Sequence, residues 1–298
     1  MIHHVPVLLD EVLGYLDMKT GGTYIDATVG FGGHSRALAQ RLQPGEGRLI
    51  GIDQDEEALS AAREELKEFP QVELVAGNFE DIREIALGLK AREVDGILMD
   101  LGVSTHQLLS DERGFGFMSP APLDMRMSRS GDLTAAELVN RLPEKQLADL
   151  IYRFGEEHRS RAVARAIVRA RPIQTARDLA SVISGALGRR GRSHPATRTF
   201  QALRIAVNRE LEVLQTAVRA ALSLLKAGGR LCVISYHSLE DRIVKDEFRV
   251  ARSEGMNILT PKPVVPSREE CRRNPRARSA KLRVAERPAS AMPTPIMV

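Results

Sequence analysis

Three aspartates end short apolar segments, and the first of them opens a glycine-dense turn. Asp26 precedes the stretch ATVGFGGHS, Asp53 ends the segment RLIGID, and Asp100 ends the segment GILMD. Asp53 lies twenty residues beyond Gly33, the spacing at which a carboxylate after the second strand of a nucleotide-binding sheet bonds a ribose. We therefore predict a nucleoside site in which Asp53 accepts hydrogen bonds from both ribose hydroxyls.

The glycine turn favours S-adenosylmethionine over a dinucleotide. The dinucleotide fingerprint is GxGxxG, but Ser35 stands where its third glycine belongs. An anionic side chain such as Asp26 is unfavourable beside a pyrophosphate, whereas it can help to order a cationic sulfonium with its ammonium group. Phe79, in the sequence GNFED after a third apolar segment, offers an aromatic face to a purine. An NAD-dependent oxidoreductase remains an alternative, which binding of a nicotinamide cofactor would support.

Asp100, at the end of the segment GILMD, is placed to polarise the group that accepts the methyl. Methyl transfer is an in-line displacement, so the nucleophile must be held close to the sulfonium carbon. An exocyclic base amine is a weak nucleophile because its lone pair is delocalised, and a carboxylate that accepts its N–H groups localises that pair. We therefore predict that Asp100 is catalytic. A cytosine C5 methyltransferase would instead need a nucleophilic cysteine near this strand, and Cys232 and Cys271 lie elsewhere.

Further candidates for the reaction are aromatic residues and one histidine. The sequence SYHS follows another apolar segment, so Tyr236 and His237 are expected in the same crevice as Asp100, because ligands bind at the carboxyl ends of parallel strands. Tyr236, Phe115 or Phe117 can stack a base that is taken out of its RNA context; the alternatives are a core tyrosine and a hydrophobic lid. His237 is a candidate general base, although the amine can release its proton to water.

Strand-like and helix-like segments alternate before residue 104, and this order predicts a parallel sheet. Near-continuous apolar strands linked by helices are typical of a sheet that is covered on both faces, and right-handed crossovers make it Rossmann-like. The fold prediction is therefore α/β. The expected strands are 23–27, 48–53, 72–76 and 96–101, and the expected helices are 35–42, 56–69 and 82–90.

A run of helices interrupts this pattern. Thr134 and Glu137 form a capping box ahead of the first of them. One long helix is expected over 199–226, after which extended segments resume at 230–235, 262–265 and 281–285. We therefore predict an all-helical domain at 110–205, inserted into a Rossmann-like domain that is formed by 1–109 and 206–298.

The helical part carries most of the positive charge. The formal net charge of the chain is +4, but residues 153–209 hold thirteen arginines against three acids. A basic segment in an otherwise acidic chain indicates a polyanionic partner; the alternative is a solvated helix face. The candidates for RNA contact share one helix face or lie in a glycine-bearing loop: Arg161, Arg165 and Arg169, and Arg189, Arg190 and Arg192.

Two further observations limit the class of protein. No apolar segment reaches the ~18 residues of a membrane span, and the N-terminus lacks the basic region of a secretory signal. We therefore predict a cytoplasmic protein without membrane contact. The two cysteines and seven scattered histidines form no metal-binding motif, so we expect no metal.

Several longer motifs, taken in order along the chain, resemble one methyltransferase family. They are HHVPVLLDEVL, TVGFGGHSRALA, MDLGVSTHQL, ERGFGFM with PLDMRM, SYHSLEDRIVK, and NPRARSAKLRVAER. Over nearly its whole length the chain is similar to the family that methylates N4 of a cytidine in the decoding centre of small-subunit (16S) ribosomal RNA. The resemblance implies a class I methyltransferase sheet, a helical insert that recognises the substrate, and cofactor contacts from Gly32, Gly33, His34, Asp53, Phe79, Asp100 and Gln107. One departure is Thr105-His106 before Gln107, where smaller or proline-like residues are expected.

The leading hypothesis is therefore an S-adenosylmethionine-dependent rRNA (cytidine-N4)-methyltransferase. Its expected partner is small-subunit ribosomal RNA or the assembled small subunit, and a homodimer is compatible with the sequence. A DNA amino-methyltransferase would share the core but would need base-edge readout of a duplex, for which we find no motif. A non-catalytic RNA-binding module in ribosome assembly is the other alternative, and the acids retained at the predicted strand ends argue against it.

Overall fold

The computed structural model describes residues 6–102, 113–128, 131–188 and 194–289. It divides into two compact units. Unit 1 comprises 1–102 and 211–298, and unit 2 comprises 103–210, whereas the sequence placed the boundaries at 109/110 and 205/206. Unit 1 holds the sheet and unit 2 is helical.

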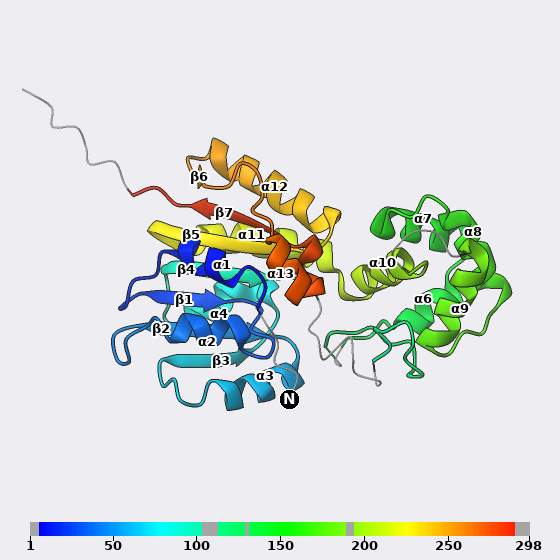
Figure 1. Cartoon of the computed structure of the whole chain (residues 1–298), viewed down its shortest axis with the longest axis horizontal. Coiled ribbons are helices and arrows are strands. Elements are labelled where there is room, and N and C mark those ends of the chain that lie inside the picture. Colours follow the sequence, from blue (N-terminus) through cyan, green and yellow to red (C-terminus); the bar gives the residue numbers. More distant parts are fainter. Residues whose placement is uncertain (1–5, 103–112, 129–130, 189–193, 290–298) are drawn as a thin grey trace, which may run out of the picture. The chain divides into compact units, whose positions relative to one another are not determined.

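Unit 1 is built on a seven-stranded sheet in the order β3-β2-β1-β4-β5-β7-β6 (Figure 1). The first five strands pair in parallel, whereas β7 runs antiparallel to β5 and to β6. The chain steps outward from β1 to β3 and then returns to β4, so the crevice of this doubly wound sheet lies at the carboxyl ends of β1 and β4. The predicted α/β class is confirmed. The strands are β1 Thr23–Asp26, β2 Arg48–Asp53, β3 Val72–Ala76, β4 Val94–Asp100, β5 Leu225–Ser235, β6 Asn257–Ile258 and β7 Lys281–Glu286.

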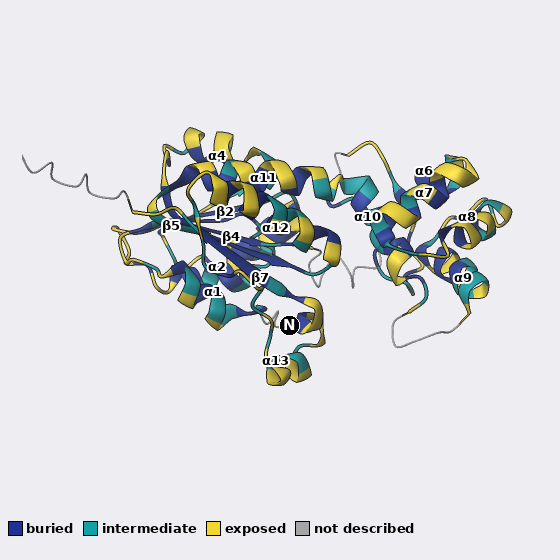
Figure 2. Cartoon of the chain, turned by 90° about the horizontal axis from the view of Figure 1, so that it is seen from above, coloured by how far each residue is buried: buried dark blue, intermediate teal, exposed yellow. Residues whose placement is uncertain are grey.

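Two layers of helices cover the faces of this sheet, as the buried strands between exposed outer helix surfaces show in Figure 2. Neighbouring strand residues point to opposite faces: Ile25 and Ile97 pack with α4, α11 and α12, whereas Tyr24 and Leu98 pack with α1 and α2. This alternation explains why the strands are apolar on both sides. The helices are α1 Leu9–Leu16, α2 Gly33–Ala39, α3 Glu56–Glu65, η1 Phe79–Asp81, α4 Ile82–Gly88, α11 Glu210–Leu224, α12 Ser238–Ser253, α13 Arg268–Arg273 and η2 Pro275–Ser279.

The structure corrects three predicted elements. The single helix expected over 199–226 is two helices, α10 (Thr197–Asn208) and α11, because Arg209 between them adopts the left-handed conformation (φ 51°) and ends α10. β5 begins directly after α11, at Leu225, and runs through Gly228 and Gly229, so it starts five residues before the strand expected at 230–235. The expected strand at 262–265 is reduced to an isolated bridge from Val264 to Leu282, whereas the strand expected at 281–285 is confirmed as β7.

Unit 2 packs its helices around a separate apolar core. The predicted capping box of Thr134 and Glu137 opens α6, and Thr175 with Asp178 forms a second one at α9. α7 and α10 approach closely at Gly155, where a side chain would collide with the carbonyl of Arg198. The helices are α6 Ala135–Arg141, α7 Glu144–Gly155, α8 Ser160–Arg169, α9 Ala176–Leu187 and α10 Thr197–Asn208.

Candidate cofactor and catalytic site

The glycine turn between β1 and α2 is held by two aspartates. Asp26 is fully buried and accepts a hydrogen bond from Ser35 Oγ at 2.6 Å. Asp53 Oδ2 accepts a hydrogen bond from the Gly30 N–H at 2.8 Å. Gly30 and Gly32 have φ values of +53° and +84°, which only glycine adopts readily. Asp26 thus anchors the turn from inside, which corrects our expectation that its carboxylate faces the cofactor.

Asp53 combines this structural role with the position of a ribose ligand. Its Oδ1 accepts a hydrogen bond from the Asp55 N–H at 2.9 Å. Burial raises the pKa of Asp53, while hydrogen bonds from the backbone of Asp55, Gly30 and Gln54 oppose this rise. Three backbone donors act on this carboxylate, which offers about four lone-pair directions, so a ribose hydroxyl would share it with the glycine turn. The contact of Asp53 with both ribose hydroxyls stays a prediction.

Phe79 lies in η1, beyond the carboxyl end of β3 and next to Asp53. β3 pairs in parallel with β2, and Ala76 is the register partner of Asp53. The side chain of Asn78 caps η1 by accepting the Glu80 N–H at 3.0 Å. Phe79 itself is half-buried against the core of unit 1, so the core supports its ring and part of the ring stays accessible. Asp53 and Phe79 therefore stand at adjacent strand ends, as a nucleoside site requires.

Asp100, the last residue of β4, contacts residues that follow the ends of the neighbouring strands β1 and β5. Its Oδ1 accepts a hydrogen bond from the Tyr236 hydroxyl at 2.8 Å, and its backbone N–H donates to Thr28 Oγ1 at 2.6 Å. Its Oδ2 lies 3.4 Å from His34 Nδ1. The structure thus brings together His34, Asp100 and Tyr236, which the sequence placed in three separate motifs.

Tyr236 can act here only as a hydrogen-bond donor near neutral pH. Burial, reinforced by the negative charge of Asp100, raises the pKa of Tyr236 well above its ordinary value. The phenol therefore keeps its proton and holds Asp100 in a fixed orientation. Gly102, two residues beyond the end of β4, has a φ of +103° and lies against the Tyr236 ring.

His34 presents an unprotonated nitrogen towards Asp100. Its Nε2 is 3.0 Å from the carbonyl oxygen of Val7, and because a carbonyl can only accept, Nε2 carries the proton. Burial lowers the pKa of His34, against the opposing charge of Asp26, so the ring is neutral near pH 7 and Nδ1 is an acceptor. Nδ1 and the Asp100 carboxylate converge as two acceptors, an arrangement that suits a ligand bringing N–H donors.

His237 caps a helix. It is the N-cap residue of α12, and its Nδ1 accepts the Glu240 N–H at 3.3 Å. Its Nε2 lies 3.2 Å from Glu240 Oε1, although without hydrogen-bond geometry. These contacts account for the ring as a capping group, and they lend no support to the general base expected at His237.

Neither cysteine lies at the end of β4. Cys232 is fully buried within β5, and burial raises the pKa of its thiol far above the ordinary range. Cys271 is half-buried in α13. Cys232 is therefore a core residue, and a thiolate at Cys232 is strongly disfavoured.

The three arginines predicted to share one face of α8 do so. Arg161, Arg165 and Arg169 are exposed, while Val163 and Ile167 on the opposite face are buried. Arg165 makes one long ion pair, at 3.6 Å, with Glu144. This helix face remains a candidate surface for RNA.

Other arginines of the basic segment bind backbone carbonyls, which the sequence could not reveal. Arg159 donates to the carbonyls of Ala186 and Leu187 at the end of α9. Arg171 donates to the carbonyls of Val139 and Leu142 at the end of α6. Such contacts satisfy carbonyls that a helix end leaves unpaired. Part of the positive charge that we assigned to a polyanionic partner therefore stabilises unit 2 itself.

The two phenylalanines proposed for base stacking lie in different environments. Phe115 is only 4% exposed and belongs to the core of unit 2, so the structure corrects its assignment as an accessible stacking residue. Phe117 is half-buried, stacks on His194 with ring centroids 4.6 Å apart, and meets the edge of Phe200. One face of Phe117 is thus already covered within unit 2.

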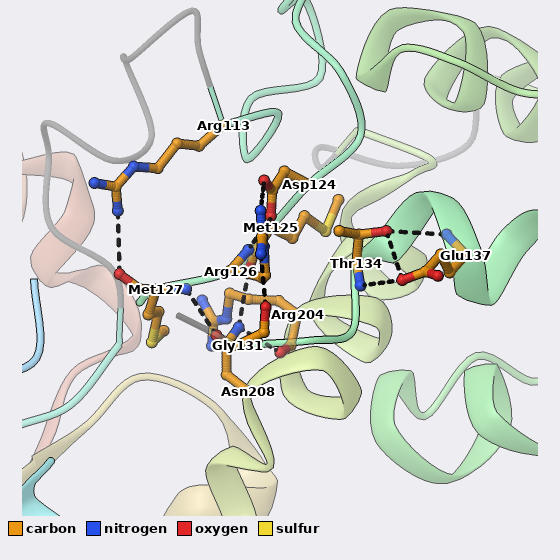
Figure 3. Close-up of polar contacts among 10 residues, drawn as sticks. All are labelled: Arg113, Asp124, Met125, Arg126, Met127, Gly131, Thr134, Glu137, Arg204 and Asn208. Atoms are coloured by element: carbon orange, nitrogen blue, oxygen red, sulfur yellow. Dashed lines mark hydrogen bonds and ion pairs between the residues drawn. The ribbon is translucent and has the colours of Figure 1, made fainter. Parts of the chain in front are cut away.

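The motif PLDMRM forms a polar network that orders unit 2 (Figure 3). Asp124 binds the Arg126 side chain through both carboxylate oxygens, at 2.7 and 2.8 Å. The amide of Asn208, at the end of α10, accepts the Met127 N–H and donates to the Met125 carbonyl, both at 2.8 Å. Asn208 was absent from our predictions because only the tertiary structure brings α10 to this loop.

Four predicted site residues lie outside the described residues: Gln107, Arg189, Arg190 and Arg192. Their roles remain predictions. Within the described part of the chain, none of the helices has the length and apolar character needed to cross a membrane.

Comparison with known proteins places the chain in one family. The family model described as "MraW methylase family" matches residues 1–288. The chain is 50% identical, over 295 residues that cover 95% of it and 98% of the relative, to the ribosomal RNA small subunit methyltransferase H of Acidobacterium capsulatum. It is also 50% identical, over 287 residues and 95% of both chains, to the protein of the same name from Coprothermobacter proteolyticus. A solved rRNA methylase from Streptococcus thermophilus aligns with a TM-score of 0.45 at 12% identity, covering 97% of this chain and 99% of that one. The chain belongs to the MraW methylase family, a family of S-adenosylmethionine-dependent methyltransferases.

Proposed function

We propose that this protein transfers a methyl group from S-adenosylmethionine to N4 of a cytidine in the decoding region of small-subunit (16S) ribosomal RNA. The observation that carries the proposal is the convergence of His34, Asp100 and Tyr236 at the carboxyl ends of β1, β4 and β5. The names of the curated relatives support the RNA substrate.

The residues on the carboxyl edge fit the cofactor chemically. Asp53 offers an acceptor to a ribose hydroxyl, and Phe79 offers an aromatic ring at the next strand end. His34 Nδ1 and Asp100 Oδ2 are acceptors 3.4 Å apart, which suits the ammonium group of the methionine part. Gly32 is the N-cap residue of α2 and Gly33 is its first residue, so both lie at a helix N-terminus, where backbone N–H groups are available to a ligand. When bound, S-adenosylmethionine supplies an electrophilic methyl group on its sulfonium.

Asp100 is the group that we assign to the acceptor amine. A carboxylate that accepts a hydrogen bond from the amine N–H localises the lone pair on the nitrogen, which makes the nitrogen a better nucleophile. Tyr236 fixes the orientation of this carboxylate through its 2.8 Å hydrogen bond, so little reorganisation is needed as charge develops on the amine. The nitrogen becomes cationic on methylation and then releases a proton to solvent.

The cysteines favour an amine acceptor over ring carbon C5. C5 methylation of cytosine proceeds through a covalent bond to a cysteine thiolate. Cys232 is fully buried with a raised pKa, and Cys271 lies in α13. Direct transfer to N4 needs no such thiolate, and Asp100 lies where it can accept a hydrogen bond from the amine.

The exposed arginines of α8 also support an RNA substrate. Arg161, Arg165 and Arg169 form a basic face on unit 2, as expected for a surface that binds a phosphate backbone. Within the described residues we see no element of the kind that reads base edges in duplex DNA, so RNA is the better substrate than DNA.

The test is nucleoside mass spectrometry of small-subunit RNA from cells that lack this protein. Loss of N4-methylcytidine, restored by the wild-type gene and not by Asp100→Asn, is the expected result. A Cys232→Ser/Cys271→Ser double variant should restore it. Cofactor binding by the purified Asp100→Asn protein, measured by calorimetry, separates lost affinity from lost chemistry. Unaltered N4-methylcytidine in the deletion strain would refute the proposal, and cofactor binding without any methyl transfer would favour the non-catalytic alternative.

A further inference from the structure

The motif NPRARSAK and the helix before it expose a cluster of positive charge. The segment 268–279, which comprises α13 and η2, contains five exposed arginines. Of its two acids, Glu269 pairs with Arg273 at 3.1 Å and Glu270 is half-buried. We call the exposed side chains the C-terminal basic surface; its members are Arg268, Arg272, Arg273, Arg276 and Arg278.

Three members of this surface keep their charge uncompensated by the protein. Over residues 6–102, 113–128, 131–188 and 194–289, no carboxylate forms an ion pair with Arg268, Arg272 or Arg278. Arg272 makes a single weak hydrogen bond, at 3.4 Å, to the Arg268 carbonyl within the same helix. Like charges held together in this way repel one another, so an anionic partner would be bound favourably here.

The surface is tied to the catalytic residues by a short chain of hydrogen bonds. Glu270 Oε1 accepts the N–H of Leu8 at 2.8 Å. The neighbouring residue, Val7, places its carbonyl 3.0 Å from His34 Nε2, and His34 lies beside Asp100. α13 is therefore fixed next to the site, where Figure 1 also shows it, near the carboxyl ends of the strands.

η2 is anchored on the same side of the site by apolar contacts. Ala277 and Ala280 are buried at 0% and 1% exposure, in the core cluster against which Tyr236 packs. The flanking Arg276 and Arg278 remain exposed. The arginines thus stand on a rigid support beside Tyr236.

We propose that the C-terminal basic surface binds the phosphate backbone of single-stranded RNA on one side of the target nucleotide. This inference rests on the proposed function, and it adds a second RNA contact, on unit 1, to the arginine face of α8. A base that reaches Asp100 brings its flanking phosphates towards a site rich in carboxylates, which repel them. Guanidinium groups beside Tyr236 offset this repulsion, because they pair with phosphate oxygens in a bidentate manner.

The composition of the surface favours a polyanion over a protein or a membrane. Protein interfaces need a buried apolar or aromatic anchor, and membrane-bound helices need an apolar face. The exposed positions of 268–279 carry arginine, Glu269, Pro275 and Ser279, with no large apolar side chain among them. Contacts of this kind bind RNA without reading its sequence.

The test compares two triple variants of the full-length protein that remove the same charge. The test variant is Arg268→Ala/Arg272→Ala/Arg278→Ala. The matched control is Arg63→Ala/Arg92→Ala/Arg252→Ala, which removes three exposed arginines from the last turn of α3, the loop before β4 and the last turn of α12. Those positions lie towards the amino ends of the parallel strands, away from the site. Binding to a protein-free small-subunit RNA transcript is measured by fluorescence anisotropy at several salt concentrations.

We expect the test variant to flatten the salt dependence of binding. Each lost phosphate contact on a single strand removes about 0.7 from the slope of log K against log salt, so three contacts remove about 2 and weaken binding at least ~10-fold at ~0.1 M salt. The control should match the wild type, and S-adenosylmethionine affinity should be unchanged in both variants. An Arg268→Lys/Arg272→Lys/Arg278→Lys variant should keep most of the slope.

An unchanged slope in the test variant, or an equal loss in both triple variants, would overturn the inference. If the alanine variant does not fold, as judged by cofactor binding, Arg268→Gln/Arg272→Gln/Arg278→Gln removes the same charge with longer side chains and is judged in the same way. The outcome is separable from the proposed function. A wild-type protein that transfers no methyl group to N4 while the two variants still differ in slope would refute the proposed function and leave this inference standing.

Discussion

Replacing Tyr236 by phenylalanine isolates one hydrogen bond of the catalytic site. The change keeps the ring, which packs against the core, and removes the hydroxyl that donates to Asp100 Oδ1 at 2.8 Å. A hydrogen bond to a charged group contributes about 1.5–3 kcal/mol. If Asp100 must be held in place while charge develops on the amine, the whole of this contribution is lost from the transition state, which corresponds to ~10-fold to ~150-fold in rate.

The assay is single-turnover methyl transfer to small-subunit RNA with saturating cofactor, together with cofactor affinity by calorimetry. We expect the rate to fall within that range while cofactor affinity changes by less than ~3-fold, because the hydroxyl bonds Asp100 Oδ1, whereas the ammonium group of the cofactor is assigned to Oδ2. The pKa of Tyr236 is raised by burial and by Asp100. A plot of rate against pH should therefore show no tyrosine ionisation between about pH 6 and 9, in the wild type or in the Tyr236→Phe variant.

Tyr24→Phe is the matched control. Tyr24 is also buried and its hydroxyl also makes a 2.8 Å hydrogen bond, but as an acceptor from the Lys19 N–H, and Tyr24 lies near the start of β1, away from the carboxyl ends of the strands. It should lose stability and keep its turnover. A double-mutant cycle with Asp100→Asn completes the test: the effect of Tyr236→Phe should largely vanish in the Asn background. A rate within twofold of wild type, or additive effects in the cycle, would refute a positioning role for Tyr236.

Three other outcomes follow from the described contacts. Asp53→Ala should lower S-adenosylmethionine affinity at least ~10-fold, because it removes a charged acceptor and also releases the Gly30 N–H; calorimetry with unchanged affinity would take Asp53 out of the site. Arg165→Ala/Arg169→Ala on α8 should reduce the salt slope of RNA binding by up to ~0.7 per contact, and an unaltered slope would make this face a merely solvated one. Burial disfavours ionisation of Asp241, but hydrogen bonds from Arg283 and Lys281 outweigh this effect, so the pKa of Asp241 is lowered. The ionised carboxylate therefore adds to the free energy of unfolding above the unfolded-state pKa of about 3.9, and this contribution is lost as the pH falls through the pKa of the folded state. Asp241→Asn should therefore reduce the free energy of unfolding by about 1–3 kcal/mol at pH 7, and urea titrations in which the gap does not narrow below about pH 4 would contradict this assignment.

The sequence was sufficient for the order of strands and helices from residue 23 to residue 101 and for the residues at the ends of those strands. The strands at 48–53 and 72–76 are confirmed at both ends, because apolar runs bounded by charged residues and glycines are local signals. Asp53, Phe79 and Asp100 could be named because a parallel sheet places all its carboxyl ends at one edge. Helix ends were less predictable: Arg209 divides a segment that is continuous in its apolar pattern, because the left-handed conformation of one residue depends on what its neighbours contact.

What a side chain does depended on partners that are remote in the chain. Asp26 reads as a cofactor ligand but is buried beneath the turn, and Phe115 reads as a stacking residue but lies in the core of unit 2. Arg159 and Arg171 contribute to the basic segment that indicated a polyanionic partner, but they bind carbonyls 27 to 32 residues away. The hydrogen bond of Glu270 to Leu8 spans 262 residues, and no pattern in the sequence announces it. Periodicity and turn chemistry are properties of neighbouring residues, so the sequence alone determined the elements and their polar ends. Burial and hydrogen-bond partners are properties of the packed chain, so only the tertiary structure decided which of the charged side chains hold the fold together and which remain available to a ligand.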